Sequence, residues 1–287
     1  QCLVPIRPEG NKTPLFLVHG AGLNVLLYQS LGKNLQPNRP IYALQAKGLD
    51  GKQQISTSIP EMAADYIIEI QQVQPNGPYH LFGISLGGFI AYEMANQLMA
   101  KGEEVRFLGV IDTVTYAAHE DLPVLQYLFR QFKLLLIKPL FILWMFLMEP
   151  WEAKGKYLAT KYGNLRHEVL YQLMKRGIIR TASLRKEKTS NDEQLPVFQK
   201  AQVAIIIYNA LKTYTLLPTQ VLLDLFRAEK KAFYIPERKT YGWGRFAKKG
   251  VKVHNIPGEH SLIFAPPNDK LFAGILDKRL EELESFD

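Results

Sequence analysis

A serine enclosed by glycines is the residue of this chain best placed for chemistry. The apolar run Tyr79–Ile84 leads into the segment Gly83-Ile84-Ser85-Leu86-Gly87, and a helical pattern follows it. In so tight a turn the residues two before and two after the serine crowd each other, and glycine at both places removes the clashing Cβ atoms. The pattern predicts a strained Ser85 at a helix N-terminus, exposed as a nucleophile. The alternative is a glycine turn that contains an idle serine.

A nucleophilic serine needs a base, and histidine is the usual one. Two of the six histidines, His254 and His260, lie near the C-terminus, where the order serine, acid, histidine places the base. His254 falls within the strand-like run "VKVHNI", whereas His260 follows in a Pro-Gly loop just beyond it. We therefore expect His260 to be the base and His254 to be a strand side chain.

The acid that orients the histidine has two candidates. Asp112 ends the strand-like run Glu104–Asp112, which follows the helix after Ser85. Glu229 comes directly after a later run, Gln220–Ala228, and continues into a lysine-rich segment. We favour Asp112, because it ends its strand cleanly beside the strand that carries the serine.

The developing oxyanion requires two backbone donors. The N–H of Leu86 is fixed by the turn, and the second donor is expected from the loop "HGAGLN", where we choose the N–H of Ala21. Gly20 and Ile84 are expected to contact the substrate, and His19 to shape the loop. No HExxH motif, cysteine cluster, P-loop or GxGxxG in a suitable place indicates a metal or a bound cofactor.

The elements that must hold these residues alternate between strand and helix. Helical patterns cover Ser58–Gln74, Leu86–Gly102 and Lys270–Leu283, and further strand-like runs are Pro14–Gly20, Arg39–Gln45 and Val251–Gly258. Apolar strands separated by amphipathic helices predict a mostly parallel sheet with helices on both faces. We divide the chain into a linker (1–13), an α/β core (14–117 and 203–287) and a helical lid insertion (118–202). Trp144 and Phe146 of the insertion are expected either to contact substrate or to pack the lid against the core.

Composition narrows the remaining classes. The net charge is +8, and basic residues gather late in the chain, but no known nucleic-acid-binding module surrounds them, so a solvated or protein-docking face is favoured. The apolar run Leu134–Met148 contains Lys138 and Pro139 and is too short for a membrane span. The single Cys2 suits a reducing compartment, and without a leader pattern we expect a cytoplasmic location. A start without Met suggests a piece of a longer polypeptide.

Several motifs together resemble one family. They are "PLFLVHGAG", "RPIYALQAKGLDG", "IPEMAADYIIEIQQVQPNGPYHLFGISLGGFIAYEMANQL", "VIDT", "YGWGRF" and "VHNIPGEHSLI". The set resembles the type I thioesterase domains of nonribosomal peptide synthetases and modular polyketide synthases, which have the α/β-hydrolase fold. The similarity covers roughly Val4–Thr113 and Val203–Leu283, and "LVPIRPEG" resembles the linker from an upstream carrier domain. The residues 118–202 match nothing that we can place.

The resemblance implies a serine thioesterase. Ser85 would take an acyl or peptidyl chain from the phosphopantetheine thioester of a carrier domain, with His260 and Asp112 as partners, and water or an internal nucleophile would release an acid or a ring. The family also places its acid where Asp112 stands. The basic face, including Lys248, Lys249 and Lys252, could meet the acidic carrier. A carboxylesterase on oxygen esters and a non-catalytic binding protein of the same fold remain alternatives.

Overall fold

The computed structural model describes residues 2–48, 56–115, 209–230, 235 and 237–285, together with 207 and seven positions between 140 and 155. The chain divides into two compact units, one made of Gln1–Ala118 with Asn209–Asp287 and the other of His119–Tyr208. The first unit contains the sheet described below. The prediction that residues 118–202 form a helical lid falls almost entirely outside the described residues and stays a prediction.

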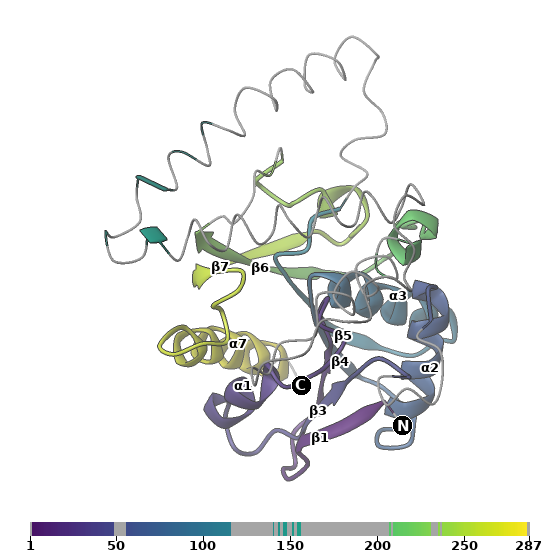
Figure 1. Cartoon of the computed structure of the whole chain (residues 1–287). Helices are drawn as coiled ribbons and strands as arrows, with labels where there is room; N and C mark the ends of the chain where they lie inside the picture. The colour runs from purple at the N-terminus through teal and green to yellow at the C-terminus, as the bar shows by residue number, and fades with distance from the viewer. Residues whose placement is uncertain are drawn as a thin grey trace, which may run out of the picture. The chain divides into compact units, whose positions relative to one another are not determined.

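A seven-stranded sheet forms the centre of the first unit (Figure 1). Its strand order is β1-β3-β2-β4-β5-β6-β7; the first pair is antiparallel and every other pair is parallel. The predicted mostly parallel sheet is therefore confirmed. The strands are β1 (Leu3–Arg7), β2 (Leu15–Val18), β3 (Ile41–Leu44), β4 (Tyr79–Ile84), β5 (Val105–Ile111), β6 (Leu223–Lys230) and β7 (Val251–Glu259).

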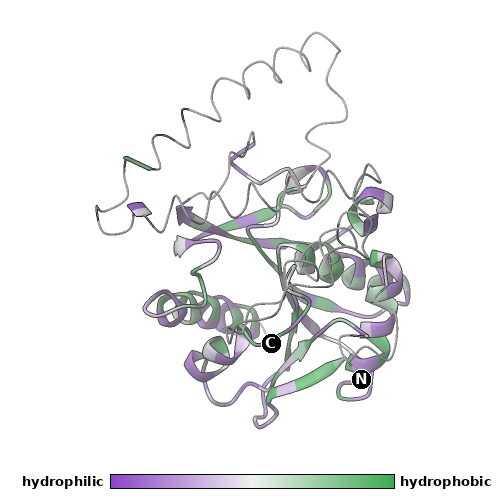
Figure 2. Ribbon diagram, viewed as in Figure 1, coloured by the Kyte–Doolittle hydropathy of each residue, from purple (hydrophilic) through white to green (hydrophobic). Residues whose placement is uncertain are grey.

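Helices cover both faces of this sheet, as predicted. On one face α2 (Ile59–Gln71) packs beside α3 (Leu86–Ala100), and on the other α1 (Tyr28–Asn34) packs beside α7 (Asn268–Glu284) (Figure 1). Strands covered on both sides must be apolar along their whole length. All six residues of β4 are buried, and the hydropathy colouring shows the hydrophobic strands between the helices (Figure 2).

Sequence signals explain the helix that supports the loop after β2. The Ser58 side chain caps α2 by accepting from the N–H of Glu61 at 3.4 Å, and Pro60 stands in the first turn, where its missing N–H costs nothing. Tyr66 lies on the buried face of this helix and is 1% exposed. The helix thus brings one tyrosine hydroxyl into the interior.

A buried charge cluster joins the last strands to α7. Asp224 of β6 is 1% exposed and accepts from Arg279 of α7 through both oxygens, at 2.7 and 3.2 Å. His254 of β7 lies 2.6 Å from the same carboxylate, from its Nε2 to Oδ1. Since a buried charge is costly without partners, this cluster fixes α7 against the sheet.

Two elements differ from the sequence prediction. The segment assigned to a linker, residues 1–13, contributes β1, so the linker assignment is wrong for Leu3–Arg7. The Arg7 guanidinium holds this strand to α1 by donating to the carbonyls of Gly32 and Leu35 at 2.8 and 2.9 Å. The short helix α1 was not predicted at all. The prolines and glycine that punctuate the segment fit an edge strand as well as a linker, because an edge strand tolerates missing donors.

Candidate active site

The serine turn has the strained geometry that the glycines predict. Ser85 joins β4 to α3 with φ 54° and ψ −116°, in a region that non-glycine residues rarely adopt. A Cβ on Gly83 would lie 2.1 Å from the carbonyl oxygen of Gly87, and a Cβ on Gly87 would lie 2.4 Å from that of His19. Both glycines are therefore required for close backbone approach.

The strand next to the serine holds the turn in place. The N–H of Ser85 donates to the carbonyl of Ile111 at 3.1 Å, and the hydroxyl of Thr113 lies 3.1 Å from the carbonyl of Ser85. A Cβ on Gly88, in the first turn of α3, would meet that hydroxyl at 2.2 Å. The end of β5 is thus packed directly against the strained turn.

Asp112 and His260 come together from separate elements. Asp112 follows β5 with φ 41°, and its Oδ1 accepts from the N–H of Ala228 at 2.9 Å. His260 directly follows β7, and its Nδ1 lies 3.5 Å from Asp112 Oδ2. The Asp112 side chain is 6% exposed and that of His260 is 28% exposed. The distance exceeds a normal hydrogen bond, and contacts of this kind often tighten only when substrate binds.

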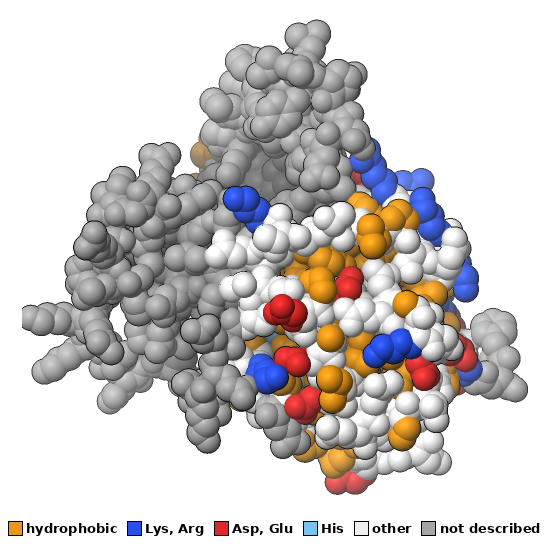
Figure 3. Space-filling model, turned by 90° about the vertical axis from the view of Figure 1, so that its right-hand side faces the viewer, with side chains coloured by type: hydrophobic (Ala, Val, Ile, Leu, Met, Phe, Trp, Pro, Cys, Tyr) orange, Lys and Arg blue, Asp and Glu red, His pale blue; other side chains and the backbone are white. Residues whose placement is uncertain are grey.

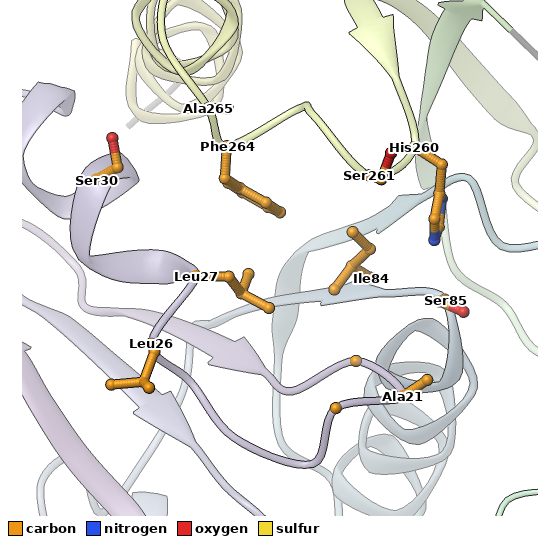
Figure 4. Close-up of a pocket in the computed structure, with 12 residues that line it drawn as sticks. Ala21, Leu26, Leu27, Ser30, Ile84, Ser85, His260, Ser261, Phe264 and Ala265 are labelled. Atoms are coloured by element: carbon orange, nitrogen blue, oxygen red, sulfur yellow. The ribbon is translucent and has the colours of Figure 1, made fainter. Parts of the chain in front are cut away.

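Ser85 and His260 line the same cavity, which has a volume of about 500 Å³. Figure 4 shows the imidazole of His260 pointing from the end of β7 toward Ser85. Because Nδ1 faces Asp112, Nε2 is the nitrogen left for the serine side. Ser85 and His260 thus line one opening at the carboxyl edge of the sheet, and Asp112 lies behind the imidazole.

The loop after β2 forms another wall of this cavity. Gly20, Ala21 and Ile84, all predicted to lie at the site, line it. Behind the loop, His19 is fully buried, with Nδ1 2.8 Å from the carbonyl oxygen of Gly20 and Nε2 2.7 Å from the hydroxyl of Tyr66. Burial lowers the pKa of His19 to about 4, so this histidine is neutral at pH 7.

The rejected candidates lie elsewhere. His254 stacks on Phe226, with ring centroids 4.6 Å apart, and contacts Asp224 rather than the cavity. Glu229 is an exposed residue of β6. The predicted lid residue Trp144 lies outside the described residues.

The other predicted lid residue, Phe146, belongs to the second unit. There the Lys154 ammonium lies 5.4 Å from the centre of its ring and 5.6 Å from that of Trp151. A substrate role for Phe146 stays a prediction.

The residues in the far part of the cavity were not predicted from the sequence. Leu26, Leu27, Ser30, Phe264 and Ala265 line it, and the side chains of Leu27 and Phe264 extend into the space between them in Figure 4. Ser30 lies in α1, Leu26 and Leu27 lie just before it, and Phe264 and Ala265 lie in the segment that precedes α7. No motif marks these residues, and only the pairing of the two helices on one face of the sheet brings them together.

Within the described parts of the chain, no group of His, Cys, Asp and Glu residues could hold a metal ion. Over the same residues, no helix has the length and apolar character needed to cross a bilayer.

A strained serine between a strand and a helix, with a histidine after the last strand and an aspartate between them in the sequence, defines the α/β-hydrolase class. Solved structures agree. One of them is the NocB thioesterase domain in covalent complex with a fluorophosphonate nocardicin G analog. It superposes on this chain with a TM-score of 0.65 at 20% identity, and the match covers 98% of this chain and all of the NocB domain. The four-domain nonribosomal peptide synthetase AB3403 covers 97% of this chain with a TM-score of 0.65 at 24% identity, over 20% of its own length.

Residues 13–124, which carry β2 to β5 and Ser85, match the family model of the thioesterase domain. Among curated relatives, a dimodular nonribosomal peptide synthase of Bacillus subtilis is 47% identical over 110 residues, which are 38% of this chain and 5% of the relative. Malpibaldin synthetase of Mortierella alpina is 45% identical over 112 residues, 39% of this chain and 2% of the relative. An atromentin synthetase of Paxillus involutus that is named inactive is 42% identical over 119 residues, 42% of this chain and 12% of the relative. The chain therefore spans only a small part of each curated relative, and the resemblance predicted from the motifs is confirmed.

Proposed function

We propose that the chain is a serine thioesterase that releases an acyl or peptidyl chain from the phosphopantetheine thioester of a carrier domain. One observation carries the proposal: Ser85 and His260 line a single cavity, and Asp112 lies 3.5 Å behind the imidazole. The relatives named as synthetases support a carrier-bound substrate, because they are much longer proteins that share this segment.

The geometry supports the following chemistry. Ser85 Oγ attacks the thioester carbon while His260 Nε2 takes the hydroxyl proton, and the oxyanion forms beside the N–H groups of Ala21 and Leu86. The C–S bond then breaks, and the thiol leaves with the proton from His260. Water or a nucleophile of the chain itself attacks the acyl-serine, with His260 again as base, and Ser85 is regenerated.

The cavity suggests which part of the substrate it accepts. Leu27, Phe264 and Ala265 form an apolar wall in the far part of the cavity, which favours an apolar group in the part of the substrate that extends away from Ser85. The volume of about 500 Å³ lies within the range of ligand pockets, about 300–1,000 Å³. We propose that this wall holds the acyl side of the thioester.

The carrier would approach from the edge of the sheet where the serine lies. Lys248 and Lys249 precede β7 and so lie at its amino edge, opposite the carboxyl edge with Ser85. The expectation that these lysines receive the carrier is therefore not supported. Lys230, the last residue of β6, lies at the carboxyl edge. On the face that Figure 3 displays, Lys and Arg gather along one margin, while Asp and Glu are scattered.

The experiment compares an acyl thioester of N-acetylcysteamine with the matched ethyl ester, and follows labelling by a fluorophosphonate. We expect thioester turnover and labelling of Ser85, both abolished in Ser85→Ala. Faster turnover of the oxygen ester would favour the carboxylesterase alternative. A folded wild-type protein without turnover or labelling would favour a non-catalytic binding protein, a result that one relative's inactive status makes worth testing.

A further inference from the structure

The buried pair His19–Tyr66 is not used by the reaction just described, yet it contacts the loop that carries the second oxyanion donor. His19 is 0% exposed and Tyr66 is 1% exposed, and neither lines the cavity. A buried polar pair is costly to form unless every bond is made, so its placement directly behind Ala21 calls for an explanation.

The bonding partners fix which nitrogen of His19 carries the proton. The carbonyl oxygen of Gly20 can only accept, so Nδ1, 2.8 Å away, must be the protonated nitrogen. In a neutral imidazole Nε2 then accepts, and the Tyr66 hydroxyl 2.7 Å away is the donor. Burial also raises the pKa of Tyr66, so the hydroxyl keeps its proton. Tyr66 therefore selects the Nδ1–H tautomer.

The bond to Gly20 determines where the N–H of Ala21 points. The carbonyl of Gly20 and the N–H of Ala21 belong to one planar trans peptide, so they point in opposite directions. The carbonyl faces the interior, where it accepts from His19 and, at 3.0 Å, from the N–H of Leu23. The N–H of Ala21 must then face the other side, which is the cavity that Ala21 lines with Ser85.

Resting on the proposed function, we propose that His19, held by Tyr66 in its Nδ1–H tautomer, is a positioning residue that aims the N–H of Ala21 at the oxyanion. The helix α2 thereby acts on catalysis through one hydroxyl, although it contributes no residue to the cavity. Without the bond from His19, only the N–H of Leu23 holds the carbonyl of Gly20, and the peptide is less firmly fixed in the geometry that stabilises the oxyanion.

A nearly isosteric pair of variants separates this role from packing. In His19→Asn the side-chain amide nitrogen can occupy the place of Nδ1 and still donate to the carbonyl of Gly20. The leucine of His19→Leu has nearly the same shape as that asparagine but carries no hydrogen-bond donor. Removing one oxyanion donor costs about 10²–10³-fold in kcat, so a donor that is only misdirected should cost part of that. We expect His19→Leu to lower kcat about 30-fold or more with little change in KM, and His19→Asn to recover most of the loss.

Stability should follow the opposite order, which keeps the test decisive. Leu is the better buried residue, so thermal unfolding should find His19→Leu at least as stable as His19→Asn. Turnover is measured per site labelled by fluorophosphonate, so that unfolded protein does not count. A kcat that follows thermal stability, with His19→Leu at least as active as His19→Asn, would overturn the proposal while leaving the thioesterase function intact.

Tyr66 is tested in the same way. Tyr66→Phe should lower kcat about 5–10-fold and weaken binding of an alkyl boronic acid, whose tetrahedral adduct with Ser85 needs the same donors. The control is Tyr79→Phe, at the amino end of β4. It removes the hydroxyl of another buried tyrosine, which donates to the main-chain carbonyls of Gln74 and Pro75, and it should change neither kcat nor the binding of the boronic acid. Two-bond ¹⁵N–¹H spectra should show His19 as the Nδ1–H tautomer in the wild type. An Nε2–H tautomer, or equal activity of Tyr66→Phe and wild type, would contradict the assignment.

Discussion

Adding one methyl group at Gly83 tests the geometry on which the whole site depends. The Cβ of Gly83→Ala would lie 2.1 Å from the carbonyl oxygen of Gly87, 2.3 Å from its carbon and 2.7 Å from the nitrogen of Gly88. Real Cβ atoms essentially never come closer than 3.0 Å to such atoms, so the backbone must move by roughly 1 Å. These are main-chain atoms of the first turn of α3, and no side-chain rotation can relieve the clash.

The displacement must therefore reach Ser85, which lies between the two glycines. A 1 Å misplacement of a reacting group costs about 10²-fold in rate, and overpacking costs about 1–3 kcal/mol of stability. We expect Gly83→Ala to lower kcat/KM for the thioester at least about 100-fold, and urea unfolding to show the stated loss of stability.

Gly274→Ala supplies the matched control, because it makes the same chemical change in α7 with no atom within 4 Å of the added Cβ. It should raise the free energy of unfolding by about 0.5–1 kcal/mol and leave turnover unchanged. If Gly83→Ala kept wild-type activity within about threefold, the strained turn would not be the source of the nucleophile's geometry.

Three further predictions concern the acid, the buried ion pair and pH. Asp112→Asn should lower kcat by about 10³–10⁴-fold with little effect on thermal stability, while Glu229→Gln should change neither; the reverse result in steady-state kinetics would reassign the acid. Arg279→Met leaves the Asp224 carboxylate buried beside His254 alone, so urea unfolding should find a loss of about 3–5 kcal/mol, and a loss under about 1 kcal/mol would contradict the burial argument. Burial and the nearby Arg39 lower the pKa of His80 to about 3 in the folded protein. As the pH falls below 6.5, the unfolded chain therefore protonates its His80 before the folded protein does. The stability contributed by His80 is complete above pH 6.5 and is lost between pH 6.5 and about 3; in His80→Leu the decline between pH 6 and 4 should be shallower by about 1.4 kcal/mol per pH unit, and an unchanged slope would refute it.

The sequence predicted those features whose cause is local. Two glycines, Gly83 and Gly87, predict the tight turn around Ser85. Asp112 and His260 each follow an apolar strand-like run, so the ends of the predicted strands were enough to place both residues at one edge of the sheet. The choice of Asp112 over Glu229 rested on the same logic, and the contacts of Asp112 with Ala228 and His260 favour it.

Features that depend on long-range packing could not be predicted in this way. The edge strand β1 pairs with β3, some forty residues later, and its prolines resemble a linker. The helix α1 has seven residues and no side-chain cap, so its signal is weak. The bond between His19 and Tyr66 joins residues 47 positions apart, and no spacing rule predicts it.

The chain leaves the sheet after β5 and returns at β6, and these strands are direct neighbours with Gly109 paired to Asp224. Asp112 donates its N–H to the carbonyl of Phe226 in β6 and so closes the base of the excursion, while Thr115 donates its N–H to the carbonyl of Tyr241, in the segment between β6 and β7. The entropy of closing a loop rises only slowly with its length. A change in the length of the segment between β5 and β6 therefore adds little to the closure entropy that the pairing of these two strands must overcome.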